Sequence, residues 1–146
     1  MSETTLQSEH ELARLPIVKT QDVLLARYVG REEATRLGFG AQALTHIATA
    51  ISEITRNIVQ HARASGQIRV FDVLENGRRG LRVAIEDDGC GIADIDRVFT
   101  GSSPGAGIPG CRKMMDTFTI RSSQGAGTCV VMTKWLPVSP LGDLRL

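Results

Sequence analysis

The sequence predicts an α+β domain, a two-layer α/β sandwich whose mixed, mostly antiparallel sheet carries its helices on one face. Segments with strand and helix patterns follow one another in the order β, α, α, β, β, α, β, β. Two pairs of strands are separated only by short stretches rich in Gly, Asn and Ser. Strands joined by tight turns pair antiparallel, which argues against a doubly wound parallel sheet. The 146 residues, 42% of them hydrophobic, suffice for one domain with a proper core.

Composition and charge exclude several classes of function. The net charge is +1 with Lys and Arg spread along the chain, whereas proteins that bind nucleic acid or a membrane surface carry a basic stripe. No apolar run approaches the ~18 residues of a membrane span, and the polar N-terminus is no signal peptide. The three cysteines form no C-x-x-C pair, so no zinc site or disulfide scaffold is indicated. We therefore expect a cytoplasmic protein with no nucleic-acid or membrane partner, and its oligomeric state stays open.

The first elements follow from local signals. A loose tail over residues 1–14 precedes a short strand at residues 15–19. Thr20 is the expected N-cap of a helix that runs to Leu37 and is stopped by Gly38. A second, longer helix is expected from Gly40 to about Ala64. Its apolar side chains recur every three or four residues and form one core-facing stripe: Leu44, Ile47, Ile51, Ile54 and Ile58.

The rest of the chain reads as four strands and one helix. The pair Asn76-Gly77 predicts a hairpin between strands at residues 67–74 and 81–87. A helical turn at 94–100 and a Gly, Ser and Pro loop at 101–107 then lead to the remaining elements. These are a helix at 108–116 and strands at 118–122 and 128–135, so that the domain spans 15–136 and a second tail spans 137–146.

Glu53, Asn57 and His61 lie four residues apart on the second predicted helix. Side chains at this spacing form one inclined row, and this row borders the apolar stripe, where the wall of a pocket could be. On its own, such a row is more often an ordinary polar flank. The motif that follows favours a functional interpretation for Glu53 and Asn57, while for His61 a structural role is the safer interpretation.

Asp87 closes a strand on which it shares one side with the apolar residues Leu81, Val83 and Ile85. A carboxylate on a core face is costly unless a donor reaches it. Gly89 and Gly91 directly behind it allow a close backbone turn, and the exocyclic amine of adenine would supply the donor. A calcium-binding loop is excluded because Gly89 occupies a position that needs an acid or amide ligand. For Asp88 we expect only a turn acid.

The run G-A-G-I-P-G from Gly105 to Gly110 fits the pattern G-x-G-x-x-G. A dinucleotide fingerprint would follow the first strand directly and would have an acid ~20 residues later, and neither holds here. The glycines instead open a helix after a loop, where backbone N–H groups and a helix terminus can hold a phosphate.

Together the three motifs resemble the GHKL family of Bergerat-type ATP-binding domains, which includes gyrase, histidine kinases and MutL. Within it, the likeness is to the small anti-sigma-factor-type serine kinases and extends over residues 17–135. The segments that carry it are L-G-F-G from Leu37, T-A-I-S-E-I-T-R-N-I from Thr49, E-D-D-G-C-G-I from Glu86, and G-A-G-I-P-G-C-R-K-M-M-D from Gly105. The stretch 99–104 is shorter than the usual lid of this family.

The resemblance implies a role for each matching residue. Asn57 would coordinate the Mg²⁺ that bridges the phosphates of ATP, and Glu53 would be the general base. Asp87 would bind the adenine amine, assisted by Thr128. The two glycine-rich segments, one that follows Asp88 and one that begins at Gly105, would complete the nucleotide site. Their residues in it would be Gly89, Gly91, Ile92, Gly105, Gly107, Ile108 and Gly110.

The expected function is therefore that of an ATP-dependent protein serine/threonine kinase in stress or sigma-factor signalling. By resemblance, it would phosphorylate a STAS-domain antagonist and, once released, activate a PP2C-type phosphatase or act on a sigma-factor regulator. The alternative is a non-catalytic, nucleotide-dependent binding module. A histidine-kinase catalytic domain is disfavoured because no helical hairpin with an acceptor histidine precedes the motifs, and a gyrase-like ATPase because no transducer domain follows.

Overall fold

The computed structural model describes residues 7–62, 65–88, 107–123 and 127–137. In chain order, the elements are β1 (Ser8–Ile17), α1 (Thr20–Leu37), α2 (Ala41–Asn57), the π-helical turn η1 (Ile58–Ala62), β2 (Gly66–Glu75), β3 (Arg78–Asp87), α4 (Gly107–Met114), β4 (Thr117–Ser123) and β5 (Gly127–Trp135). None of the helices in these ranges combines the length and hydrophobicity needed to cross a membrane.

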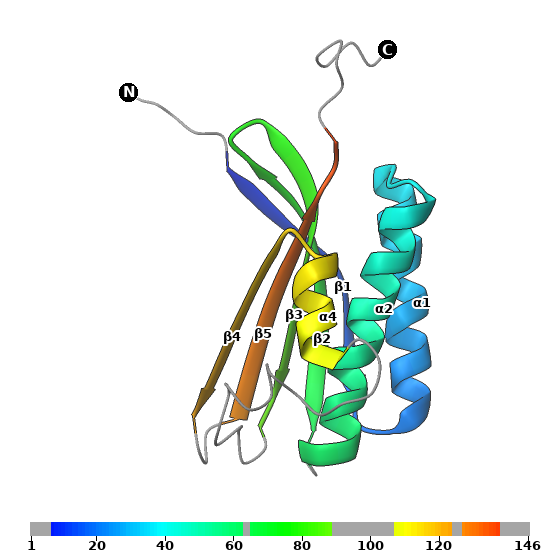
Figure 1. Cartoon of the computed structure of the whole chain (residues 1–146), viewed down its shortest axis with the longest axis vertical. Helices are drawn as coiled ribbons and strands as arrows, with labels where there is room; N and C mark the ends of the chain where they lie inside the picture. Colours follow the sequence, from blue (N-terminus) through cyan, green and yellow to red (C-terminus); the bar gives the residue numbers. More distant parts are fainter. Residues whose placement is uncertain (1–6, 63–64, 89–106, 124–126, 138–146) are drawn as a thin grey trace.

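The strands form one sheet in the order β1-β2-β3-β5-β4. Each neighbouring pair among the described strands is antiparallel, and the helices cover one face (Figure 1). Between the helices and the sheet lies the main core, to which α2 contributes Ile47, Ile51 and Ile54 and β3 contributes Leu81, Val83 and Ile85. The two-layer sandwich expected from the sequence is confirmed.

The first strand begins at Ser8, where a loose tail through residue 14 was expected, so that expectation is corrected. Residues 8–17 pair with β2 from Ser8 opposite Leu74 to Ile17 opposite Gly66. Most side chains of β1 are exposed, and only Ile17 is fully buried. Because β1 is held by backbone pairing at the sheet edge, its sequence lacks the apolar alternation that reveals a half-buried strand.

Helix α1 has the expected bounds, and Gly38 ends it in the left-handed conformation at φ 102°. Its N-cap is Lys19 and not the expected Thr20. The reason is that the Asp22 carboxylate, one turn into the helix, accepts hydrogen bonds from the backbone N–H groups of Val18 (2.9 Å) and Lys19 (3.0 Å). The Asp22 side chain thus makes the N3 half of a capping box, while the backbone N–H of Asp22 donates to the carbonyl oxygen of Lys19 (2.9 Å).

The second helix is α-helical only to Asn57 and continues as the π-helical turn η1, where a regular helix to about Ala64 was expected. Glu53 and Asn57 both lie on the α-helical part of this segment, four residues apart, whereas position 61 falls in the π-helical turn. The row that was expected to include His61 stays a prediction at that position, because the His61 side chain lies outside what the structure describes. Turns of this kind occur often at functional sites.

The hairpin at Asn76-Gly77 is confirmed. Both residues have positive φ, 53° and 79°, as in the two-residue turns that match the twist of the flanking strands. The ends of α4, β4 and β5 lie within two residues of those expected. The helical turn expected at 94–100, most of the loop at 101–107 and the tail beyond residue 137 lie outside the described residues.

Candidate active site

Glu53 and Asn57 are positioned by the last turn of α2, whose apolar stripe packs on the sheet. Ile54 and Ile58 of that stripe are buried, which fixes the rotation of the helix about its axis. Glu53 therefore points outward. Its side chain is 25% exposed and its carboxylate forms an ion pair with the Arg56 guanidinium at 2.8 Å. Asn57 is half-buried and is the last α-helical residue before the π-helical turn.

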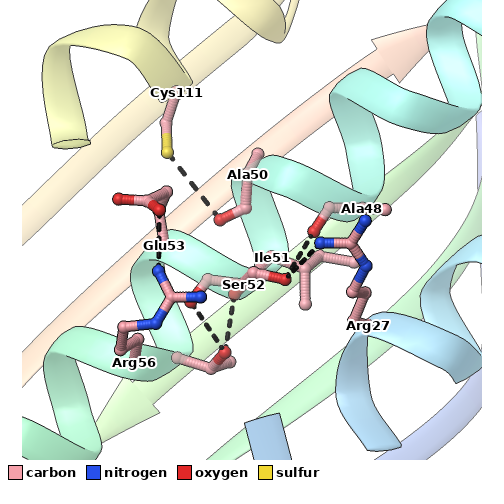
Figure 2. A network of polar contacts seen from close by, with 9 residues as sticks. Arg27, Ala48, Ala50, Ile51, Ser52, Glu53, Arg56 and Cys111 are labelled. Carbon is pink, nitrogen blue, oxygen red and sulfur yellow. Dashed lines mark hydrogen bonds and ion pairs between the residues drawn. The ribbon is translucent and has the colours of Figure 1, made fainter. Parts of the chain in front are cut away.

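Helix α4 packs against α2 beside Glu53 (Figure 2). The Cys111 thiol of α4 donates a weak hydrogen bond to the carbonyl oxygen of Ala50 (3.7 Å). Burial, together with the negative charge of Glu53, raises the pKa of Cys111 to about 12, so this thiol remains protonated and packs as a small apolar group. Helix α4 begins at Gly107, and Gly110 lies next to Cys111. The last part of the G-x-G-x-x-G motif is therefore on the helix that contacts α2.

Asp87 lies at the end of β3, directly opposite Thr128 at the start of β5. As expected, it follows three buried side chains on its face, those of Leu81, Val83 and Ile85, and is itself half-buried. The Thr128 hydroxyl hydrogen-bonds with the Ser122 hydroxyl on β4 at 2.9 Å. The neighbouring Asp88 is exposed, and its interpretation as a turn acid stays a prediction because the residues after it lie outside the described ranges.

A cavity of about 220 Å³ lies at this end of β3, β4 and β5. Its lining residues are Glu86, Asp87, Arg121, Ser122, Gly127, Thr128 and Cys129. Small-molecule sites usually measure about 300–1,000 Å³, so this hollow alone is too small for a whole nucleotide. The ends of α2 and β3 and the starts of α4 and β5 all lie at the lower end of Figure 1. The fold thus brings Glu53, Asn57, Asp87 and Thr128 to one end of the domain.

Gly127 is a residue of this end that the sequence motifs missed. It adopts a positive φ of 85°, and a Cβ added there would collide with the backbone carbonyl of Asp87. Only glycine lets β5 begin this close to the end of β3. The sequence shows Gly127 merely as one glycine of a turn, because the contact depends on the register between two distant strands.

Of the other expected site residues, Gly89, Gly91, Ile92 and Gly105 lie outside the described residues, and Ile108 is described only as part of α4. Within the described ranges, no group of three His, Cys, Asp or Glu side chains is placed to hold a metal ion. The half-buried Asn57 carries an amide oxygen, which is a ligand type that Mg²⁺ accepts beside phosphate oxygens.

Residues 18–134 match the family model described as the histidine kinase-like ATPase domain. The chain belongs to the histidine kinase-like ATPase family. Among curated relatives, it is 42% identical to the serine/threonine-protein kinase RsbT of Bacillus subtilis over 125 residues, which is 82% of this chain and 93% of that protein. It is also 30% identical to an anti-sigma F factor of Caldanaerobacter subterraneus over 130 residues, 81% of this chain and 88% of the relative.

Two solved structures show the same fold as this histidine kinase-like ATPase domain. A Mycobacterium tuberculosis structure of RsbU and RsbW domains superposes with a TM-score of 0.60 at 18% identity over 86% of this chain, which corresponds to 34% of that longer chain. The histidine kinase domain of a blue-light activated kinase from Erythrobacter litoralis superposes with a TM-score of 0.52 at 22% identity, over 78% of this chain and 57% of that one.

Family and relative together assign the enzyme class. The chain has the histidine kinase-like ATPase domain, and it is 42% identical to a serine/threonine-protein kinase over 93% of that protein. It is therefore an ATP-dependent protein serine/threonine kinase. The resemblance to the anti-sigma-factor-type kinases inferred from the sequence motifs is thereby confirmed.

Proposed function

We propose that this kinase phosphorylates a serine of a STAS-domain antagonist and, once released from it, activates a PP2C-type phosphatase in stress or sigma-factor signalling. The observation that supports catalysis is that the end of α2, with Glu53 and Asn57, lies at the same end of the domain as the pair Asp87 and Thr128. Support for the partners comes from the relatives, one named a serine/threonine-protein kinase and one an anti-sigma F factor.

Asp87 and Thr128 are assigned to the adenine end of ATP. The Asp87 carboxylate would accept a hydrogen bond from the exocyclic amine, and the Thr128 hydroxyl, held by Ser122, would assist it. The first backbone N–H groups of α4, those of Gly107, Ile108 and Gly110, would face the phosphates, while Pro109 has no N–H to donate. Asn57 would hold Mg²⁺ through its amide oxygen, and the ion would neutralise charge on the phosphates.

Glu53 is assigned the role of general base. Its carboxylate is partly exposed on the outer side of α2, so a serine hydroxyl of a docked protein can reach it. Glu53 would take the hydroxyl proton while the serine oxygen forms a bond to the γ-phosphorus and the bond from that phosphorus to the bridging oxygen of ADP breaks. Phosphoryl transfer depends more on positioning than on covalent help, which fits a site that offers one base and several polar contacts.

The test is phosphotransfer from labelled ATP and Mg²⁺ to purified STAS-domain proteins of the same organism, compared between the wild type and Glu53→Gln. We expect phosphoserine with the wild type, and a loss of about 10²–10⁴-fold with Glu53→Gln at nearly unchanged ATP affinity. Glu33→Gln is the matched control, since Glu33 is also paired with an arginine three residues later, at 3.1 Å. Equal activity in Glu53→Gln would remove Glu53 from the base role.

The similarity to an anti-sigma F factor supports a second candidate, a regulatory module that sequesters its partner and uses nucleotide only as a switch. Its signature would be a stable, nucleotide-dependent complex with a sigma factor or phosphatase and no phosphoserine on any STAS-domain protein. The placement in the cytoplasm stays a prediction, which fractionation of the native cell would test.

A further inference from the structure

Exposed apolar side chains gather on the N-terminal half of α1. In the described part of the chain, the large apolar side chains that are exposed are Leu24 (66%), Leu25 (47%) and Tyr28 (62%) on this helix, and Val18 just before it. Single exposed apolar residues are ordinary, but a group on one face marks an interaction surface. Leu24, Leu25 and Tyr28 are named the α1 strip.

The α1 strip lies on the solvent side of its helix because other residues of α1 form the side that packs against the rest of the domain. Leu24 and Tyr28 are four residues apart and lie one above the other. The buried side of α1 is formed by Val23, Ala26, Gly30 and Ala34. Gly30 contributes no side chain, and a Cβ there would collide with Ile51 of α2, so α1 sits close against α2. The α1 strip is therefore not part of the core of this domain.

Two arginines border the α1 strip. Arg27 and Arg31 are also four residues apart, and Arg31 follows Tyr28 by three residues. Neither forms an ion pair within the described ranges, in contrast to Arg36 at the end of the same helix, which pairs with Glu33 at 3.1 Å. Two positively charged side chains, Arg27 and Arg31, thus lie beside the α1 strip without a carboxylate partner among the described residues.

One arginine of this border, Arg27, contacts α2 at the residue that precedes the proposed base. The Arg27 guanidinium donates a hydrogen bond to the Ser52 hydroxyl on α2 at 3.4 Å, and Ser52 immediately precedes Glu53 (Figure 2). Arg56, the partner of Glu53, is exposed on the same outer surface of α2. A protein seated on the α1 strip would therefore reach across α2 to Glu53.

We propose that the α1 strip is the docking surface for the protein substrate, and that the substrate presents an apolar ridge bordered by carboxylates. This inference rests on the proposed kinase function, because it names how the same site selects its substrate. The ridge would bury Leu24 and Tyr28, and the carboxylates would pair with Arg31 and its neighbour Arg27. Buried aromatic and aliphatic anchors supply most of the affinity of such surfaces, while bordering charges speed association and fix orientation.

The experiment uses the STAS-domain protein that the wild-type kinase phosphorylates. Its KM and kcat are measured for Tyr28→Ser, Leu24→Ser and Arg31→Gln, with ATP affinity from calorimetry and folding from circular dichroism. We expect KM for the protein substrate to rise about tenfold for each, with kcat at saturation within about twofold and ATP affinity unchanged. Raising the salt concentration should increase the wild-type KM more than that of Arg31→Gln.

Arg36→Gln is the matched control, since it removes the same charge from the same helix outside the α1 strip and should leave KM unchanged. If the wild type phosphorylates its partner and the strip variants keep the wild-type KM, docking on α1 is refuted while the kinase function stands. A fall in kcat together with ATP affinity would also overturn it, because the effect would then lie in the fold. If no STAS-domain protein is phosphorylated, the proposed function itself fails. A variant that alters the mass of the kinase alone in solution would instead assign the strip to a second copy of this chain.

Discussion

The Glu53 carboxylate and the Arg56 guanidinium lie 2.8 Å apart on consecutive turns of α2, at the candidate active site. Glu53 is the less exposed partner, with 25% of its side chain accessible against 46% for Arg56. Exposed pairs three residues apart contribute only about 0.2–0.5 kcal/mol to folding. The contact therefore matters less for stability than for the direction in which the carboxylate points.

Arg56→Gln is expected to lower kcat several-fold, because the Glu53 carboxylate loses the group that holds it. The melting temperature should change little, and the KM for ATP should stay near that of the wild type. Steady-state phosphotransfer combined with thermal unfolding measures both effects. Arg36→Gln breaks a similar pair on α1 and should leave kcat unchanged. A kcat equal to that of the wild type would show that Glu53 needs no such support.

Asp87→Asn is expected to weaken ATP binding by roughly 10- to 100-fold, since a hydrogen bond to a charged group contributes about 1.5–3 kcal/mol. The half-buried position of Asp87 beside the cavity supports this assignment. Calorimetric titration with an ATP analogue is the direct measurement. Asp88→Asn changes the exposed neighbouring acid and should bind as the wild type does. Unchanged affinity in Asp87→Asn would refute contact with the adenine amine.

Gly127→Ala is expected to destabilise the fold by about 1–3 kcal/mol or more, because it combines an unfavourable positive φ with a collision against the Asp87 backbone. Gly77→Ala separates the two causes. Gly77 also has a positive φ, 79°, but no atom lies within 4 Å of an added Cβ. Chemical denaturation should therefore show a larger loss for Gly127→Ala. Equal losses would mean that β5 can move away from β3 without cost.

Asp22 provides a test that depends on pH. Its hydrogen bonds from the backbone of Lys19 and Val18 hold the pKa of this carboxyl below its usual 3.8. A depressed folded-state pKa stabilises the fold above the unfolded pKa, and this contribution is lost as the pH falls through the folded value. Asp22→Ala should therefore lower the free energy of unfolding by about 0.3–1 kcal/mol at neutral pH, as for a carboxylate in the first turn of a helix, and by progressively less in acid. A stability difference for Asp22→Ala that stays constant across this pH range would contradict the capping role.

Where local chemistry determines structure, the sequence predicted it well. Gly38 marks the end of α1 because only a left-handed residue closes the helix there, and Asn76-Gly77 marks the hairpin for the same reason. The side of β3 that carries Asp87 followed from simple alternation. These signals act over a few residues, and the fold class follows from their order.

Relationships between distant segments escaped sequence reasoning. The contact of Gly127 with Asp87 depends on the register of β3 and β5, and that of Arg27 with Ser52 on how α1 lies against α2. The π-helical turn after Asn57 has no marker in the residue types of 58–62. The ion pair between Glu53 and Arg56 was also missed, although their spacing of three residues permits it.

The early start of β1 has a practical consequence for anyone who shortens this protein. A version trimmed to Leu15, as the sequence pattern alone would suggest, would leave residues 69–74 of β2 without hydrogen-bonding neighbours on that side. Exposed strand edges can pair with strands of other molecules. In the intact domain, residues 8–14 of β1 pair with this part of β2, and β1 carries the charged residues Glu9, Glu11 and Arg14. The trimmed protein should consequently precipitate or self-associate, although every residue of the candidate active site would be intact.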